Sequence, residues 1–290
     1  MTRRRWAGNE KAAVLFLLPG LIGFLAFFLI PFIISLYYAS VDNVFDRRFV
    51  GFQNFRDILG NAPFLHALTA TVSFIGLCVP LGMVLSLLLA FLVNKAGSCG
   101  GFFGMIFLMP LVIPSAATSF FWKNIFSING ALNGFLLYFG QPPRDWLQTD
   151  MAMPIMILVF LWKNLGYNLV LYMAGLKNIP EAYYEYAGVE GAGRLQKFRH
   201  ITLVYLRPTL LLVFIMSVIN SFKVFKEIYL IAGQYPHESI YMLQHYMNNM
   251  FFALNYQKLS TASYILTFFI VMIVLLLFYG EKKLYEKTEG

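Results

Sequence analysis

The run of residues 66–93, HALTATVSFIGLCVPLGMVLSLLLAFLV, decides the fold of this chain. It contains no Asp, Glu, Lys or Arg and is longer than the about 20 helical residues that cross a hydrocarbon core. Backbone N–H and C=O groups inside lipid must be paired within the segment, and only a helix or a closed barrel achieves this. The run therefore predicts a transmembrane helix.

The remainder of the chain contains further long apolar runs. Of its 290 residues, 59% are hydrophobic and only 12% are charged, which is too little polar surface for a soluble domain of this size. We therefore expect an all-α polytopic membrane protein with six transmembrane helices, forming a single domain over residues 1–290. The six apolar runs cover residues 12–38, 66–93, 102–126, 151–176, 206–232 and 259–280. Pro110 and Pro114 predict a kink in the third run.

The charges indicate orientation. The net charge of +8 forms no basic helix or stripe of the kind that binds nucleic acid, because the basic residues lie between apolar runs. Most of them fall in the N-terminal segment, the second and fourth loops and the C-terminal tail, so the positive-inside rule places both termini in the cytoplasm. The first apolar run is nearly twice the usual length of a signal core, and we interpret it as an uncleaved anchor.

Motifs for catalysis or metal binding are not found in the sequence. Cys78 and Cys99 have neither metal-ligand spacing nor an evident partner. A Walker-type loop, a Gly-x-Ser-x-Gly elbow and a His-Glu-x-x-His pair are also missing. We expect no catalytic residue, metal or cofactor on this chain, so any ATP must be bound by another one.

Several polar side chains lie inside the predicted spans, where they should face protein or water because lipid does not solvate them. Candidates for a substrate path are Asn164, Tyr167, Asn168, Asn220 and Ser221. Amides and aromatic rings suit sugars, although the same residues can simply join helices. Lys223 and Glu227 are four residues apart in the fifth run, which predicts an ion pair along one helical face.

The long fourth loop, residues 177–206, carries the clearest functional signal. It reads as two short helices around Gly191 and Gly193, which permit a sharp bend. Small residues, including Ala187 and Ala192, would let another backbone approach, and Glu185 and Glu190 offer polar contacts. The pattern is typical of a docking knob, and a solvated helix pair linking two spans is the alternative.

This loop resembles the cytoplasmic EAA loop of bacterial binding-protein-dependent ABC importers, whose pattern is Glu-Ala-Ala, three residues, Gly, nine residues and Ile-x-Leu-Pro. The residues that match it are Glu185, Ala187, Gly191, Ile201 and Leu203, all at the required spacing. Three residues depart from it, namely Tyr186 for the middle Ala, Glu190 for the usual Asp, and Val204 for the final Pro. Segments 51–55, 110–114, 197–203 and 221–229 extend the resemblance to the carbohydrate branch, which includes the maltose and glycerol-phosphate importer membrane subunits.

The resemblance implies a type I ABC importer permease architecture and a pore-forming role in sugar, polyol or sugar-phosphate import across a bacterial plasma membrane. The chain is expected to lie in the membrane and to have three kinds of partner: a second permease, two ATPase subunits that hold ATP and magnesium, and an extracytoplasmic sugar-binding protein. The pair of permeases is expected to be a heterodimer, with a homodimer as the alternative. The residues expected to couple to the ATPases are Glu185, Tyr186, Ala187, Glu190, Gly191 and Ala192. An ATP-independent channel or secondary transporter and a membrane-embedded transferase are the alternatives.

Overall fold

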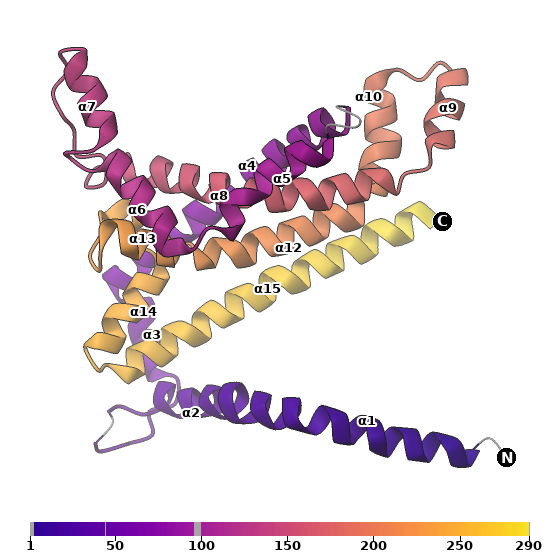
Figure 1. The fold of residues 1–290 in the computed structure, drawn as a ribbon. Helices are drawn as coiled ribbons and strands as arrows, with labels where there is room; N and C mark the ends of the chain where they lie inside the picture. Colours follow the sequence, from indigo (N-terminus) through magenta and orange to yellow (C-terminus); the bar gives the residue numbers. More distant parts are fainter. Residues whose placement is uncertain (1–2, 44, 96–99, 290) are drawn as a thin grey trace. The chain divides into compact units, whose positions relative to one another are not determined.

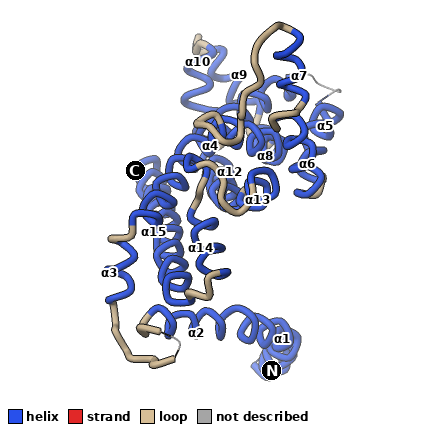
Figure 2. The backbone as a smooth tube through the Cα atoms, turned by 90° about the vertical axis from the view of Figure 1, so that its left-hand side faces the viewer, coloured by secondary structure: helices blue, strands red, loops and turns tan. Residues whose placement is uncertain are grey.

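The computed structural model describes residues 3–43, 45–95 and 100–289, and this part of the chain is helical apart from loops and one isolated bridge between Val41 and Phe49 (Figure 2). The first half contains α1 (Arg3–Phe24), a π-helical turn (Leu25–Leu29), α2 (Ile30–Ala39), α3 (Gln53–Leu59), α4 (Ala62–Lys95), α5 (Gly100–Val112), α6 (Ser115–Phe126) and α7 (Ala131–Tyr138) (Figure 1). The second half contains α8 (Ala152–Lys177), α9 (Glu181–Val189), α10 (Arg194–Lys197), a π-helical turn (Phe198–Thr202), α11 (Leu203–Tyr205), α12 (Arg207–Lys223), α13 (Phe225–Ala232), a 3-10 turn (Glu238–Ile240), α14 (Leu243–Phe252) and α15 (Tyr256–Glu289). Cys99 lies outside the described residues.

All six predicted apolar runs coincide with helices. Five helical segments are long and apolar enough to cross a membrane, and the bent pair of α5 with α6 and α7 is the candidate for a sixth span. The five segments are Ala13–Ala39, Ala62–Lys95, Ala152–Lys177, Arg207–Ala232 and Tyr256–Leu276. The chain is therefore an all-α polytopic membrane protein.

The third run is broken rather than gently kinked. Its two parts meet at 92°, and the break falls between Val112 and Ser115. Pro114 explains the position, since proline disfavours helical geometry in the preceding residue and cannot donate a backbone hydrogen bond. Pro110, in contrast, stays inside α5.

The described chain divides into two compact units. One comprises Met1–Phe64 with Met247–Met272, and the other comprises Leu65–Tyr246 with Ile273–Gly290. In the first unit the Tyr264 hydroxyl donates to the Phe32 carbonyl oxygen, and the two rings lie 4.8 Å apart between centroids. These contacts join α2 to α15.

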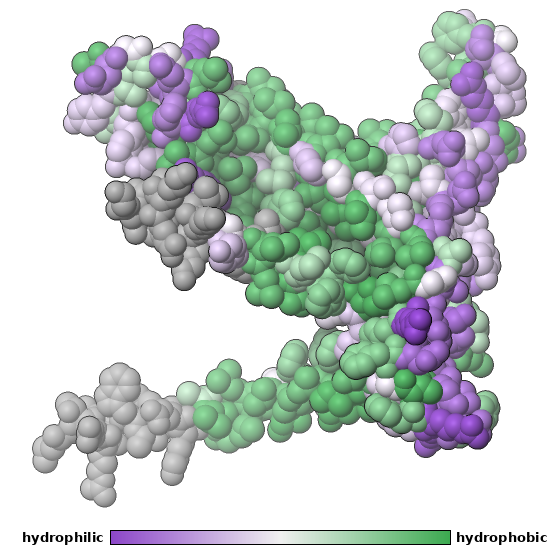
Figure 3. Space-filling view, turned by 180° about the vertical axis from the view of Figure 1, so that it is seen from behind, coloured by the Kyte–Doolittle hydropathy of each residue, from purple (hydrophilic) through white to green (hydrophobic). Residues whose placement is uncertain are grey.

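The second unit is organised around α8, the most enclosed of the spans, with 56% of its apolar window buried. Its core side chains Met156, Val159 and Phe160 belong to one hydrophobic cluster with Phe74 and Cys78 of α4 and with residues of α6 and α13. Figure 3 shows hydrophobic residues over the middle of this unit's helices and hydrophilic residues toward the ends. This distribution is the one expected of helices immersed in lipid.

α5 and α8 approach each other closely at Gly166. A Cβ atom at this position would lie 1.8 Å from the carbonyl oxygen of Phe107. Small residues allow such contacts between membrane helices, whose association depends on packing because lipid supplies no hydrophobic drive between them. Gly166 therefore sets the distance between the two helices.

Candidate functional site

The fourth loop folds into α9 and α10, which lie side by side (Figure 1). α9 ends at Val189, and the chain then turns at the left-handed residue Gly191, whose φ is +77°. The Ala192 amide donates to the Ala187 carbonyl over 2.8 Å, and the Gly191 amide donates to the Gly188 carbonyl over 3.1 Å. These two bonds form a Schellman motif, which favours glycine at the left-handed position. The bend predicted at Gly191 is therefore present.

Large apolar side chains of this loop are exposed. Tyr186 is 72% exposed, Val189 88% and Leu195 77%. Glu185 and Glu190 are exposed beside them, whereas Ala187 and Ala192 are half-buried on the inner side. A hollow of about 320 Å³ on that side is lined by Ala187, Glu190, Gly191, Ala192, Gln196, Lys197, His200 and Ile201. These exposed apolar side chains are the part of the loop that a docking partner would cover.

Contacts within the loop tie α9 to the residues that precede the fifth span. The Lys197 ammonium donates to the Tyr184 carbonyl over 2.9 Å, and the Tyr184 hydroxyl lies 2.9 Å from the Thr202 hydroxyl. The rings of Tyr183 and Tyr205 are 5.1 Å apart. A hydrogen bond between these two side chains, followed by burial, raises the pKa of Tyr205. α9 is thus attached to the segment that leads into α12.

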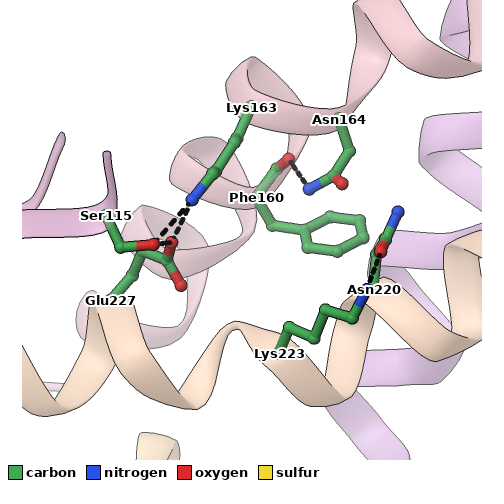
Figure 4. A network of polar contacts seen from close by, with 7 residues as sticks. All are labelled: Ser115, Phe160, Lys163, Asn164, Asn220, Lys223 and Glu227. Atoms are coloured by element: carbon green, nitrogen blue, oxygen red, sulfur yellow. Dashed lines mark hydrogen bonds and ion pairs between the residues drawn. The ribbon is translucent and has the colours of Figure 1, made fainter. Parts of the chain in front are cut away.

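A polar cluster lies where α6, α8 and α13 meet, and we call Ser115, Lys163 and Glu227 the Lys163 cluster (Figure 4). The Lys163 ammonium forms an ion pair with Glu227 and donates to the Ser115 hydroxyl over 3.0 Å. Ser115 in turn donates to Glu227 over 2.8 Å. The side chain of Glu227 is only 5% exposed and that of Lys163 18%, so each charge depends on the other for compensation.

The predicted pair between Lys223 and Glu227 is wrong. Glu227 points toward Lys163, and the Lys223 ammonium instead lies 3.3 Å from the Asn220 side-chain oxygen. A break at Val224 separates α12 from α13. The two side chains therefore do not share one regular helix, which is the condition for a four-residue pair.

Two of the five substrate-path candidates lie together. Asn164 and Asn220 both line a cavity of about 190 Å³ whose wall also includes Lys163, Lys223, Lys226 and Glu227. The Asn164 amide nitrogen donates to the Phe160 carbonyl over 2.9 Å, leaving its oxygen directed elsewhere (Figure 4). The amide groups of Asn164 and Asn220 therefore form part of the polar wall of this cavity.

The other three candidates take different positions. The amide nitrogen of buried Asn168 donates to the Ser217 hydroxyl over 3.0 Å, joining α8 to α12. Ser221 is buried and donates to the carbonyl of Val218 in its own helix. Tyr167 is half-buried on α8 and does not line the cavity. The contacts of Asn168 therefore support the alternative role, in which this residue joins two helices.

Lys163 and Ser115 are cavity residues that the sequence prediction missed. A lysine in the middle of an apolar span was a visible signal, because a charge at that depth calls for a partner or water. Ser115 had no comparable signal, since a serine after a proline is ordinary at the start of a helix. Among the described residues no group of three or more His, Cys, Asp or Glu side chains is placed to hold a metal ion.

The geometry is that of a bundle of apolar, membrane-length helices with a polar cavity lined by residues of α5, α6, α8, α12 and α13, and with two short helices exposed in the fourth loop. It defines a polytopic membrane protein. Residues 79–281 match the family described as the binding-protein-dependent transport system inner membrane component, and the chain belongs to this family.

The similar proteins are permeases of ABC transport systems, in agreement with the family match. The chain is 31% identical to the probable ABC transporter permease protein YesP of Bacillus subtilis, over 93% of this chain and 90% of the relative. It is 31% identical to the trehalose/maltose transport system permease protein MalF of Thermococcus litoralis, over 79% of each chain. Its fold matches that of a bacterial ABC transporter involved in the import of the acidic polysaccharide alginate, with a TM-score of 0.81, 24% identity and coverage of 97% of this chain and 99% of that chain. The architecture is thus that of an ABC importer permease.

Proposed function

We propose that this chain is the pore-forming permease subunit of an ATP-driven, binding-protein-dependent carbohydrate importer. The observation that carries the proposal is the exposed, apolar α9 knob, which ends in the Gly191 turn at the position of the EAA loop. The names of several relatives specify carbohydrates, among them arabinooligosaccharides for one permease and trehalose and maltose for another. The substrate class is therefore a sugar or a sugar derivative.

The coupling role belongs to Glu185, Tyr186, Ala187, Glu190, Gly191 and Ala192. In this proposal the exposed Tyr186 ring enters a cleft of an ATPase subunit, and Glu185 and Glu190 make polar contacts at its rim. The bonds of Tyr184 to Lys197 and Thr202 then pass a displacement of α9 to α12. Since α12 carries part of the cavity wall, ATPase closure would change the cavity.

Further features of the assembly follow from the same proposal. A second permease, in a heterodimer, completes the pore, and two ATPase subunits hold ATP and magnesium. An extracytoplasmic sugar-binding protein delivers the substrate, as the solved alginate transporter with its pentasaccharide-bound periplasmic protein illustrates for that system. This chain lies in a bacterial plasma membrane as a single domain with both termini and loop 177–206 cytoplasmic. It carries no catalytic residue or cofactor.

The substrate path passes Asn164 and Asn220, whose amides suit sugar hydroxyl groups. Tyr167 lies on the same helix as Asn164 but outside the wall of this cavity, and in this proposal its ring contacts the sugar at another point of the path. Asn168 and Ser221 support the packing of α8 and α12. Amides and aromatic rings are the groups that proteins use to hold a neutral polyol.

The test is gentle purification of this chain from its native membrane, identification of the co-purifying chains, and an ATP hydrolysis assay with a panel of sugars and the matching binding protein. The expected result is an associated ATPase whose turnover rises with one class of sugar. A lone chain under conditions that preserve related complexes would contradict the proposal and favour a channel or secondary transporter.

A further inference from the structure

The cavity beside the Lys163 cluster carries an unbalanced charge. Among the described residues, its wall contains three lysines, Lys163, Lys223 and Lys226, and one carboxylate, Glu227. Glu227 is already engaged by Lys163 and Ser115. Within the described part of the chain no carboxylate pairs with Lys223 or Lys226, so two positive charges remain uncompensated at the cavity.

These two lysines cannot be placed in lipid. They lie nine and six residues before the end of the Arg207–Ala232 span, which at about 1.5 Å per residue is about 14 and 9 Å along the helix. A charged side chain at such depth is costly in hydrocarbon and faces protein or a water-filled cavity. Both side chains are exposed within this chain and line the cavity, which agrees with a water-filled path.

A neutral sugar does not account for this arrangement. Amides such as Asn164 and Asn220 are sufficient to bind the hydroxyl groups of a neutral sugar. The ammonium groups of Lys223 and Lys226 beside them add two positive charges, which a negatively charged ligand would compensate. The Asn220 oxygen accepts one Lys223 N–H bond at 3.3 Å. Because an ammonium group has three donors, it retains others for a ligand.

We propose that this cavity binds the negatively charged group of an acidic sugar, with Lys223 and Lys226 as its counter-charges. Asn164 and Asn220 then contact hydroxyl groups of the same molecule. Lysine supplies a compact, flexible point charge, so recognition at these positions depends on positive charge. The inference rests on the proposed importer function. The anionic group is a carboxylate of a uronic acid or a phosphate ester, which share charge and acceptor oxygens.

The experiment uses the complete complex in proteoliposomes with its binding protein. Three sugars are compared: a uronic-acid oligosaccharide, the same oligosaccharide with its carboxyl groups reduced to alcohols, and a sugar phosphate. Uptake of the uronic acid alone assigns a carboxylate, and uptake of the phosphate alone assigns a phosphate ester. Preferred uptake of the reduced, neutral sugar overturns the inference while leaving the importer function intact. If none of a broad sugar panel is taken up or stimulates ATP hydrolysis, the importer function itself fails and the inference with it.

Variants then separate recognition in this chain from recognition in the binding protein. The double variant Lys223→Gln/Lys226→Gln should lower uptake of the acidic sugar about tenfold or more, the size expected when charge-assisted hydrogen bonds are lost. Stimulation of ATP hydrolysis by the loaded binding protein should persist, and Lys223→Arg/Lys226→Arg should keep most of the uptake.

Unchanged uptake in the double glutamine variant overturns the inference. A parallel loss of ATP hydrolysis and of complex assembly also overturns it, because that result assigns the lysines to pairs with the second permease. If the double variant does not insert, Lys226→Gln alone replaces it, since no hydrogen bond or ion pair of the Lys226 side chain occurs in the described chain. The same two criteria then apply to the single variant.

Discussion

Two glycines in the second unit illustrate two different reasons for having no side chain. Gly166 lies in regular helix α8, and its missing Cβ admits the backbone of α5. Gly191 lies in open space at the end of α9, where no atom would oppose a Cβ, but its φ of +77° disfavours any other residue. The first glycine is required by packing against a distant segment, and the second is required by the local backbone.

The difference extends to the regions around these glycines. The α9–α10 loop is held by hydrogen bonds within or near the loop itself, such as the bond of Lys197 to Tyr184. The Lys163 cluster joins residues 48 and 64 positions apart in the chain. We therefore expect changes in the membrane region to affect stability first, and changes in the loop to affect coupling first.

The largest effect is expected from Gly166→Ala. The added methyl group would overlap the Phe107 carbonyl oxygen, which belongs to the backbone and cannot rotate away. α5 and α8 must then separate, and we expect a loss of about 3 kcal/mol or more, with little folded protein recovered. Thermal unfolding in detergent measures this. Gly104→Ala is the matched control, because its Cβ meets nothing within 4 Å, and equal stability of the two variants would contradict the close approach.

The second largest effect is expected from Glu227→Ala, which leaves the Lys163 charge without its partner. Breaking a buried pair costs about 3–5 kcal/mol, and the partial exposure of Lys163 reduces this to about 2–3 kcal/mol. The double variant Glu227→Ala/Lys163→Met should recover much of the loss. A double-mutant cycle on the unfolding temperature in detergent measures the coupling, and additive losses would show that the two charges act independently.

Gly191→Val should have a smaller effect on stability and a large effect on function. A β-branched residue at this positive φ costs about 1–3 kcal/mol locally, and the Schellman turn that orients α9 is lost. We expect normal membrane insertion with uptake uncoupled from ATP hydrolysis.

Gly193→Ala serves as the control for Gly191→Val, since φ at Gly193 is −70° and its Cβ would make only an ordinary contact at 3.7 Å. Normal sugar uptake by Gly191→Val would refute a role of this turn in coupling.

Tyr184→Phe should have the smallest effect. It removes the hydrogen bond to Thr202 and nothing else. The loss lowers the free energy of local opening by about 1 kcal/mol, which raises the equilibrium constant of opening about fivefold. Hydrogen exchange of the α9 amides should speed up by this factor while the unfolding temperature stays nearly constant. Tyr186→Phe is the control, because its ring is exposed; equal exchange in the two variants would mean that the Tyr184 bond does not anchor α9.

The features that could be predicted are those set by residues close together in the sequence. Apolar length located every span. Proline chemistry predicted a kink at Pro110 and Pro114, and the chain breaks only at Pro114, by 92°. Glycine spacing located the turn at Gly191. The prediction failed for Lys223 and Glu227, because it assumed a continuous helix across Val224 and could not include Lys163, which lies on another span.

The sequence by itself determined the all-helical membrane fold, the positions of the spans and the bend of the fourth loop, because these follow from hydrocarbon thickness and local backbone preference. Only the tertiary structure decided which polar residues meet. It brought Asn164 and Asn220 to one cavity, directed Asn168 to Ser217, and supplied Glu227 with Lys163 and Ser115. Helices that are apolar all round give little periodic signal for the face that each one buries. Their rotation and partners are set by close packing, as at Gly166.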